Sequence, residues 1–426
     1  MKLWDKGYTT NNIVDKYTTG KDRILDLKLA KHDVTGSVAH AKMLHSINIL
    51  SKDELDAVLK GLSEIQKTID DGTFIIEDSF EDVHSKIEFE LVQKIGDAGK
   101  KIHTARSRND QVLVDLHLYT KAEILEMKEG VKKLFDTLME LSDTYKDVLI
   151  PGYTHLQVAM PSSFGLWFAS YAECLIDDLI LLNAAYKISN QNPLGSAAGY
   201  GSSFPINRTM TTELMGFETL KYNVVAAQMS RGRLEKTTAF AMASVSSTLS
   251  KLASDVCLYM SQNFNFLGFP KELTTGSSIM PHKQNPDVFE LLRAKSNKVQ
   301  NLPTEMIMIT NNLTSGYHRD FQLLKENYME AIDILKDNLE VTSFMLQHVI
   351  VNQDAVDDAI YDYMYSVEEV NKLVMSGMTF RDAYKKLGTE IFAGDFNPDK
   401  KVIHSHEGSI GNLCLKEIQN KFEANF

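Results

Sequence analysis

Cysteine and long apolar runs are scarce in this sequence of 426 residues. Its three cysteines, Cys174, Cys257 and Cys414, lie far apart and form no CxxC pair. This spacing argues against a disulfide framework or a cysteine metal site and favours buried free thiols. No window approaches the roughly 18 uncharged apolar residues that a membrane span needs, and the start, MKLWDKGYTT, has no apolar leader. We therefore expect a cytoplasmic protein.

Basic residues are also fewer than acidic residues. The chain has 45 Lys and Arg residues against 57 Asp and Glu residues, a formal net charge of −12, and it has no run of five or more basic residues. Nucleic-acid-binding proteins need a basic surface to neutralise phosphates. Nucleic acid is therefore not an expected partner.

Proline is absent from residues 1–150 and 304–397, so long helices are permitted in both stretches. Between Arg233 and Leu267 there is neither Gly nor Pro. Apolar residues recur there at spacings of 4, 3, 4 and 3, namely at Val245, Leu249, Leu252, Val256 and Tyr259. This spacing predicts a helix that packs lengthwise on other helices.

Similar apolar periodicity predicts further long helices, and no stretch shows several short alternating runs typical of strands. The periodic stretches are 111–141, 164–186 and 330–350, and Gly and Pro gather in polar connections at 151–161, 193–205 and 268–286. We predict an all-α protein with a central bundle of long helices. We expect three domains: an N-terminal helical domain at 1–104, the long-helix bundle at 105–351 and a small C-terminal helical domain at 352–426.

The segment GSSIMPHKQNPD, residues 276–287, is the richest candidate for chemistry. As a plain connection between helices, it would use Asn285 as an N-cap and Pro286 in the first helical turn. That interpretation leaves two serines and Lys283 unexplained. Backbone amides and a lysine before a helix would instead hold a carboxylate, while a serine reaches the neighbouring C–H.

The segment PGYTHLQ, residues 151–157, is expected to enter the following helix, with Thr154 as a possible N-cap. A lone histidine such as His155 is more often structural than catalytic. Glu290, on the helix after the serine segment, could orient the imidazole and raise its basicity. The sequence does not show whether the two residues meet.

The segment ARSRNDQ, residues 105–111, precedes a long amphipathic helix. Two interpretations explain this segment equally well. Ser107 or Asn109 could cap the helix. Alternatively, arginines followed by polar residues, here Arg108 and Asn109, could bind a dicarboxylate.

Two other segments give weaker signals. Residues 192–208 are Gly-rich but lack the GK[ST] ending of a phosphate loop. His404 and His406 have no neighbouring Cys or clustered acids, which favours a solvated loop over a metal site. We predict no metal.

Together these motifs resemble the fumarase/aspartase superfamily, whose GSSxMPxKxNP signature the serine segment matches. Within it, the chain most resembles the argininosuccinate lyase family, which includes crystallin-like relatives. The resemblance extends over nearly the whole length, through DVTGSVAHAKML at 33–44, EDVHSKIE at 81–88, GDAGKKIHTARSRNDQV at 96–112, PGYTHLQ, FPINR at 204–208 and GYHRDFQLLKE at 316–326.

This resemblance implies a carbon–nitrogen lyase of arginine biosynthesis that needs no cofactor and cleaves argininosuccinate into arginine and fumarate. Ser277 matches the catalytic serine of the family's mobile loop, and we assign it as the base. His155, polarised by Glu290, matches the other half of the acid/base pair, and which group takes the proton stays open. Lys283 and Asn285 would stabilise the charge on the substrate carboxylate.

The resemblance also implies the substrate contacts and the assembly. The matching contact residues are Ser37, Asn109, Thr154, Tyr317, Gln322 and Lys325, with Ser107 and Arg108 beside them. The family forms homotetramers with a twenty-helix core, and each active site combines three subunits. Val158, Met160 and His318 depart from the family pattern, so a lyase acting on another amino-succinate stays open, as does a catalytically silent scaffold.

Overall fold

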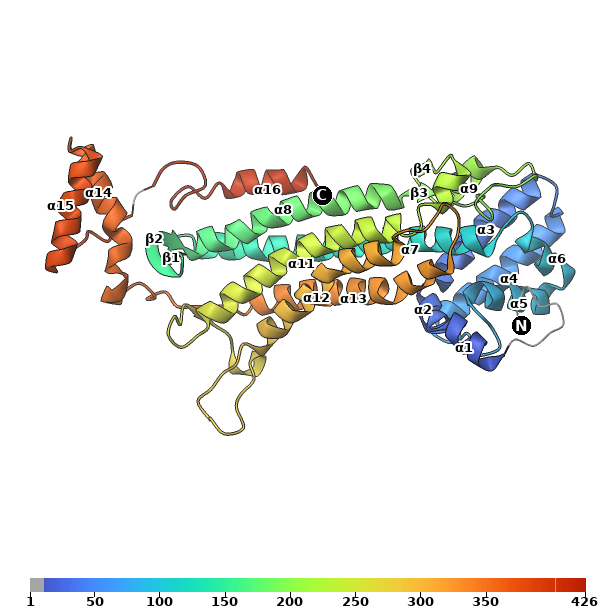
Figure 1. The fold of residues 1–426 in the computed structure, drawn as a ribbon, viewed down its shortest axis with the longest axis horizontal. Helices are drawn as coiled ribbons and strands as arrows, with labels where there is room; N and C mark the ends of the chain where they lie inside the picture. Colours follow the sequence, from blue (N-terminus) through green and yellow to red (C-terminus); the bar gives the residue numbers. More distant parts are fainter. Residues whose placement is uncertain (1–10, 403) are drawn as a thin grey trace. The chain divides into compact units, whose positions relative to one another are not determined.

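The computed structural model describes residues 11–402 and 404–426 and is mostly helical (Figure 1). It forms two compact units. The first comprises residues up to Met127 with Leu181–Ser244 and Lys298–Leu335, and the second comprises Lys128–Ile180, Val245–Asn297 and Lys336–Phe426. The all-α prediction is confirmed, with only short two-stranded sheets added among the described residues. The division into three domains stays a prediction.

The structure has five long helices, four of which overlap the stretches where apolar periodicity predicted them, whereas α12 was not predicted from periodicity. They are α7 (Arg108–Thr144), α8 (Phe164–Ser189), α11 (Arg233–Tyr259), α12 (Asp287–Thr310) and α13 (Leu324–Leu346). The predicted stripe on α11 is buried at Val245, Leu249, Leu252 and Val256. Helix α12 contains Pro303 in its interior, although proline normally interrupts helices.

Polar side chains also join these helices within each unit. In the first unit, Thr120 of α7 and Tyr328 of α13 share a buried hydrogen bond of 2.8 Å between their hydroxyls. In the second, the Asn338 side-chain amide of α13 donates to Ser296 Oγ of α12 at 3.2 Å. Buried polar groups need such partners, so these pairs also fix which helices lie together.

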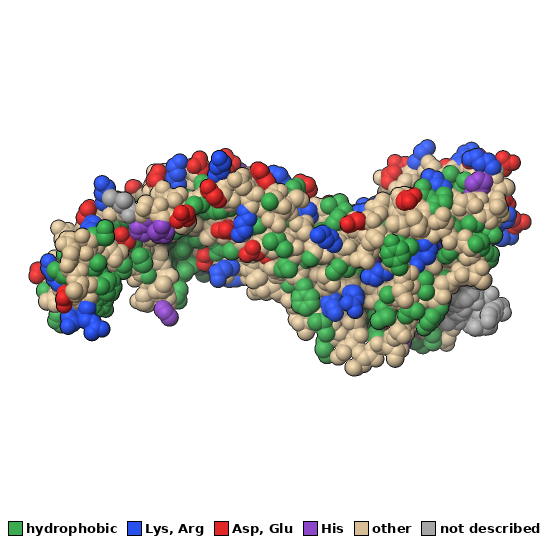
Figure 2. Space-filling model, turned by 90° about the horizontal axis from the view of Figure 1, so that it is seen from above, with side chains coloured by type: hydrophobic (Ala, Val, Ile, Leu, Met, Phe, Trp, Pro, Cys, Tyr) green, Lys and Arg blue, Asp and Glu red, His purple; other side chains and the backbone are tan. Residues whose placement is uncertain are grey.

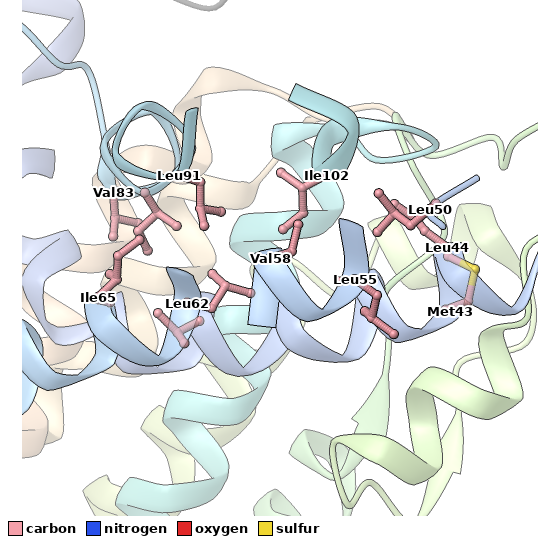
Figure 3. Packing of buried hydrophobic residues seen from close by; sticks show 14 of the residues in the cluster. Met43, Leu44, Leu50, Leu55, Val58, Leu62, Ile65, Val83, Leu91 and Ile102 are labelled. Atoms are coloured by element: carbon pink, nitrogen blue, oxygen red, sulfur yellow. The ribbon is translucent and has the colours of Figure 1, made fainter. Parts of the chain in front are cut away.

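Shorter helices build the rest of the first unit around a core of their own (Figure 3). These are α1 (Asn12–Thr19), α2 (Asp22–Leu25), α3 (Ala30–Ser46), α4 (Lys52–Asp70), α5 (Val83–Ile95) and α6 (Asp97–Lys100), with 3₁₀ turns η1 (Asp26–Lys28) and η2 (Lys101–His103). Leu62 and Ile65 of α4 pack in this cluster with Val83 and Leu91 of α5. Each fully buried side chain of this size contributes about 1.5–3 kcal/mol.

Glycine sets the spacing of α4 and α5. A Cβ atom at Gly61 would lie 2.8 Å from a Leu91 methyl carbon, closer than real Cβ contacts.

Helix α4 begins with a capping box, in which Ser51 and Glu54 satisfy each other's backbone amides.

The remaining elements are short. The first unit adds α9 (Arg208–Leu214), α10 (Val224–Gln228), η4 (Arg319–Leu323) and the parallel pair β3 (Gln191–Asn192) and β4 (Thr219–Leu220). The second unit holds β1 (Leu149–Thr154), β2 (Gln157–Ser163), β5 (Leu267–Gly268), η3 (Lys271–Leu273), β6 (Ile350–Val351), η5 (Ala359–Tyr365), α14 (Ser366–Met375), α15 (Phe380–Ala393) and α16 (Leu415–Glu423).

The PGYTHLQ segment is a β-hairpin, so the prediction that it enters a helix was wrong. Strand β1 pairs with β2 through Thr154 and Gln157, which leaves His155 and Leu156 as a two-residue loop. Both have positive φ, 54° and 58°, as the tightest hairpin turns require. The segment lacks the Asn-Gly or Asp-Gly signal of such turns. Two prolines, Pro151 and Pro161, pair across the strands. They are tolerated because both strands of a two-stranded sheet are edge strands, which do not need every amide as a donor.

Acidic and basic side chains are interspersed over the face in Figure 2, with apolar side chains between them. Among the described helices, none is long and apolar enough to cross a membrane.

One buried histidine yields a stability prediction. Burial, aided by the Arg106 charge, lowers the pKa of His40 to about 3, and the ring nitrogen Nε2 is bonded to Thr104 O at 2.8 Å. Below pH ~6.5 this residue takes up a proton only when the protein unfolds, so its contribution to stability falls as the pH falls.

The His40→Gln variant keeps a side-chain N–H donor but cannot titrate. We expect its free energy of unfolding to depend less on pH, by about 1.4 kcal/mol per pH unit, between about pH 6 and pH 5. Urea unfolding at several pH values measures this slope. An unchanged slope would show that His40 takes up its proton in the folded protein.

Candidate active site

A cavity of about 210 Å³ in the first unit brings together charged side chains of both signs. Five residues predicted from the sequence line it: Arg108, Asn109, Tyr317, Gln322 and Lys325. Further charged groups in its wall are Asp22, Asp26, Glu81, Asp82, His84, Arg231 and Arg319. Such a lining suits a zwitterionic ligand with charged groups along its length.

The start of α7 serves the fold and the cavity together. Ser107 caps the helix, since its Oγ accepts from the Asn109 amide at 3.2 Å and its own amide donates to Asp110 Oδ1 at 2.9 Å. The next residue, Arg108, faces the cavity and donates to Glu81 Oε2 at 2.8 Å. The capping and binding interpretations of this motif are therefore compatible.

Asp110 joins the Gly-rich loop to the start of α7. Its Oδ2 accepts from the backbone amides of Gly195 at 2.9 Å and Ala197 at 2.8 Å. Burial raises the pKa of Asp110, against the lowering effect of these backbone donors. The loop therefore has a structural anchor beside the cavity wall.

Lys325 and Arg231 are both buried in the wall of the cavity, at 4% and 6% exposure. Lys325 Nζ lies 2.7 Å from Asp22 Oδ1 and 2.6 Å from Asp26 Oδ1. Burial alone would lower the pKa of Lys325, but the two carboxylates outweigh it and raise that pKa. Burial raises the pKa of Asp22 to about 6 even though Lys325 opposes the shift.

Two residues of η4 connect the cavity to the end of α1. The Gln322 side-chain amide donates to Thr18 O at 2.9 Å and Thr19 O at 3.0 Å. Arg319 donates to Glu81 Oε1 at 3.0 Å and to Thr18 O at 2.9 Å. These bonds hold the Tyr317–Gln322 segment against the cavity.

Ser37 does not line this cavity, although the resemblance suggested a substrate contact. It is buried on α3, where its Oγ accepts from Arg106 Nη1 at 2.9 Å and donates to Asp33 Oδ1 at 3.3 Å. Its role in the described structure is to connect a buried arginine to a buried aspartate.

The serine segment lies in the second unit, in the long loop between α11 and α12 that projects from the helices in Figure 1. A backbone bond of 2.8 Å from the Asn285 amide to Thr275 O closes its neck. Asn285 is not the N-cap of α12: its side chain donates to Gly276 O at 3.3 Å instead, and Pro286 O accepts the Glu290 amide. The asparagine thus fixes the loop rather than the helix end.

Inside the loop, two backbone amides point at the catalytic candidate. Ser277 Oγ accepts from the amides of Ile279 at 3.3 Å and Met280 at 3.1 Å. A serine hydroxyl is a weak base, and donors at its oxygen stabilise the alkoxide form. The exposed Lys283 ammonium forms no ion pair with any described residue, so it is available to an anion.

His155 stands exposed at the tip of the β1–β2 hairpin, next to Thr154. A positive φ at two successive non-glycine residues costs about 1 kcal/mol or more each and is often found at functional sites. Among the described residues, no hydrogen bond or ion pair joins His155 to Glu290, which is also exposed. The proposed orientation of the imidazole by Glu290 is therefore absent from the single chain.

The sequence interpretation missed several charged residues of the cavity wall. Glu81, Asp82 and His84 belong to EDVHSKIE, and Arg319 belongs to GYHRDFQLLKE, both of which were recognised as motifs. The dense charge in those two motifs was the available signal. Asp22 and Arg231 lie in no recognised motif and could not be selected.

Comparison with known proteins gives a consistent result. A family model described as a lyase matches residues 8–301. The chain is 60% identical over 418 residues to the argininosuccinate lyase of Parabacteroides distasonis, covering 98% of this chain and 94% of that protein. It is 39% identical over 384 residues to the argininosuccinate lyase of Thermotoga neapolitana, covering 90% and 96%.

Two solved structures share the fold at low sequence identity. An EDDS lyase variant with bound fumarate has a TM-score of 0.76 and 22% identity, covering 91% of this chain and 78% of that one. A fumarate lyase:delta crystallin from Brucella melitensis bound to cobalt has a TM-score of 0.75 and 16% identity, covering 94% and 91%.

Proposed function

Because the chain belongs to the argininosuccinate lyase family, we propose that it is a carbon–nitrogen lyase that cleaves argininosuccinate into arginine and fumarate. The observation that carries this proposal is 60% identity to an argininosuccinate lyase over 98% of the chain. The intact serine loop and the mixed-charge cavity support it. The enzyme would act in the cytoplasm, in arginine biosynthesis.

The proposed reaction is an elimination in which only side chains move protons, while backbone amides stabilise the serine oxygen. Ser277 removes a proton from the carbon next to a succinyl carboxylate, and the resulting negative charge spreads onto that carboxylate. The bond between the succinyl carbon and the guanidino nitrogen then breaks, giving fumarate, and His155 protonates the departing nitrogen. Each proton transfer needs a group with a suitable proton affinity. The two amides that donate to Ser277 Oγ stabilise its alkoxide form and so make the serine a better base.

The charge on the substrate carboxylate increases in the transition state, so donors aimed at it accelerate the reaction. Lys283 is suited to this role because it carries an unpaired charge in the same loop as Ser277. Asn285 fixes the neck of that loop through Gly276. Thr154, beside His155 on the hairpin, would contact the same end of the substrate.

The arginine half of the substrate would occupy the cavity of the first unit. Its guanidino and amino groups are cationic and match the acidic groups Glu81 and Asp82, while its carboxylate matches Lys325 or Arg108. Tyr317, Gln322 and Asn109 supply neutral hydrogen-bonding groups in the same wall.

We further propose a homotetramer whose active sites combine residues from different subunits. The absence of a bond between His155 and Glu290 within the described chain supports this arrangement. Exposed apolar side chains on the long helices, such as Leu181, Phe240, Met308 and Phe344, provide surface for subunit contacts.

Mixing two inactive variants tests the shared sites. His155→Asn and Ser277→Ala proteins, each nearly inactive, are expected to regain a substantial fraction of native activity when unfolded and refolded together, because some hybrid sites receive both native residues. Activity that stays at the level of the separate variants, in mixtures confirmed to contain hybrid tetramers, would contradict the shared arrangement.

A substrate panel tests the specificity. Argininosuccinate and other amino-succinates would be compared by ultraviolet absorbance of released fumarate, with the proposal predicting the highest kcat/KM for argininosuccinate. A higher value for another adduct would assign the enzyme to that substrate, a result that Val158, Met160 and His318 would help to explain. No release from any adduct would identify a silent scaffold.

A further inference from the structure

A buried cluster of ionisable side chains lies at the wall of the cavity in the first unit. It consists of His84 on α5 with Asp33 on α3 and Asp115 on α7, and all three are at most 4% exposed. His84 also lines the cavity itself. Neither the acid/base pair nor the predicted substrate contacts include it.

One ring nitrogen of His84 is fully engaged by this cluster. Nδ1 donates to Asp33 Oδ2 in a short hydrogen bond and lies 3.6 Å from Asp115 Oδ2. Asp33 is fixed in turn, since it accepts from the Gln111 side-chain amide at 2.9 Å and from Ser37 Oγ at 3.3 Å. The imidazole orientation is therefore determined by three helices.

The charges in the cluster follow from its burial and pairing. Burial would lower the pKa of His84, but the Asp33 carboxylate outweighs it and the pKa is raised. Burial and the neighbouring Asp33 charge hold the pKa of Asp115 well above its usual range. These shifts favour the anionic form of Asp33, whose pKa is lowered, and the protonated forms of His84 and Asp115.

The other ring nitrogen, Nε2, makes no hydrogen bond with any described residue. A protonated imidazole carries an N–H on each nitrogen, so Nε2 can donate to a ligand. Because Asp33 holds Nδ1 and His84 lines the mixed-charge cavity, Nε2 is the ring nitrogen available to an anionic group of a ligand.

We propose that His84 is a substrate-binding residue whose Nε2–H donates to a carboxylate oxygen of the ligand in this cavity, and that Asp33 is the positioning residue that orients its ring. This inference rests on the proposed function and adds a contact to it. The same three side chains have ligand atoms within 4.8 Å of one another, as a metal site would. The direct bond between His84 and Asp33 favours the hydrogen-bonding role instead.

Two isosteric variants separate the two ring nitrogens. In His84→Asn the side-chain amide replaces Nδ1, which keeps the bond to Asp33 and removes the Nε2 donor. In His84→Gln the amide reaches the Nε2 position and keeps a donor towards the cavity. We expect KM for argininosuccinate to rise roughly 10- to 100-fold in His84→Asn, because the variant loses one charge-assisted hydrogen bond to the substrate. The change in kcat should be smaller. The rise in His84→Gln should be smaller.

His40→Gln is the matched control, because His40 is another buried histidine of the same unit that lies away from the cavity. Its KM should be unchanged. Circular dichroism and the oligomeric state confirm that each variant is folded. A normal KM in folded His84→Asn, or equal KM values in His84→Asn and His84→Gln, would overturn the proposal.

Binding of the two products, measured by calorimetry, identifies the carboxylate. Weaker binding of arginine to His84→Asn assigns the contact to the carboxylate of the arginine half, and weaker binding of fumarate assigns it to the succinyl half. Unchanged binding of both overturns the proposal. Native protein assayed in parallel separates the two hypotheses: inactive native protein removes the proposed function, whereas an active native protein and an unaffected variant remove only this contact.

Discussion

Replacing Ser277 by alanine is expected to lower kcat for fumarate release by about 10²- to 10⁴-fold, the range typical for loss of a catalytic proton-transfer group. The two amides that now bond to Ser277 Oγ would have no oxygen to stabilise, so the variant loses both the base and its activation. The loop is largely exposed, so the free energy of unfolding should change by less than about 0.5 kcal/mol.

Ser278 provides the matched control for this prediction. It is the neighbouring serine, it is exposed and it has no hydrogen bond to a described residue through its side chain. Ser278→Ala should therefore retain activity within a few-fold of the native protein. Equal losses in both variants would show that the loop as a whole, and not Ser277, is required.

Replacing Lys325 by methionine is expected to lower the free energy of unfolding by about 3–5 kcal/mol at pH 7, as loss of one partner from a buried ion pair does. The change leaves the buried carboxylate of Asp26 and the half-buried carboxylate of Asp22 without their cation. KM for argininosuccinate should rise as well, since Lys325 lines the cavity. Urea unfolding at equal protein concentrations measures the first effect, and steady-state kinetics measure the second.

Lys21→Met tests whether burial is the cause. Lys21 also pairs with a carboxylate, that of Glu326, but both side chains are largely exposed. Exposed pairs contribute little, so this variant should lose no more than about 1 kcal/mol. Similar losses in the two lysine variants would contradict the importance of burial at Lys325.

The long helices were predictable because their signal is local. The stripe from Val245 to Val256 repeats every three or four residues, and no proline or glycine interrupts it, so burial of one face follows directly. The prediction failed where the signal was ambiguous. At His155 a turn without glycine was taken for a helix entrance. The alternative that Asn285 caps the helix was also wrong, because its side-chain nitrogen donates to the loop neck and its oxygen does not accept from any described residue of the helix.

The candidate site was predictable only through its motifs. The unusual composition of the serine loop marked it as a candidate site. In the structure, two backbone amides donate to Ser277 Oγ, which explains how this serine could act as a base. The charged wall of the cavity depends on residues far apart in sequence, such as Asp26, Glu81 and Lys325. Their proximity is set by helix packing, and no local pattern encodes which acids and which cations will share a wall.

The measurement that tests the central claim most directly is the release of both products from argininosuccinate by the purified native protein, with a chelator present and no cofactor added. We predict fumarate and arginine in equal amounts, with a rate proportional to enzyme concentration. A folded, oligomeric protein that releases neither product, or that needs an added metal or cofactor to release them, would contradict the account.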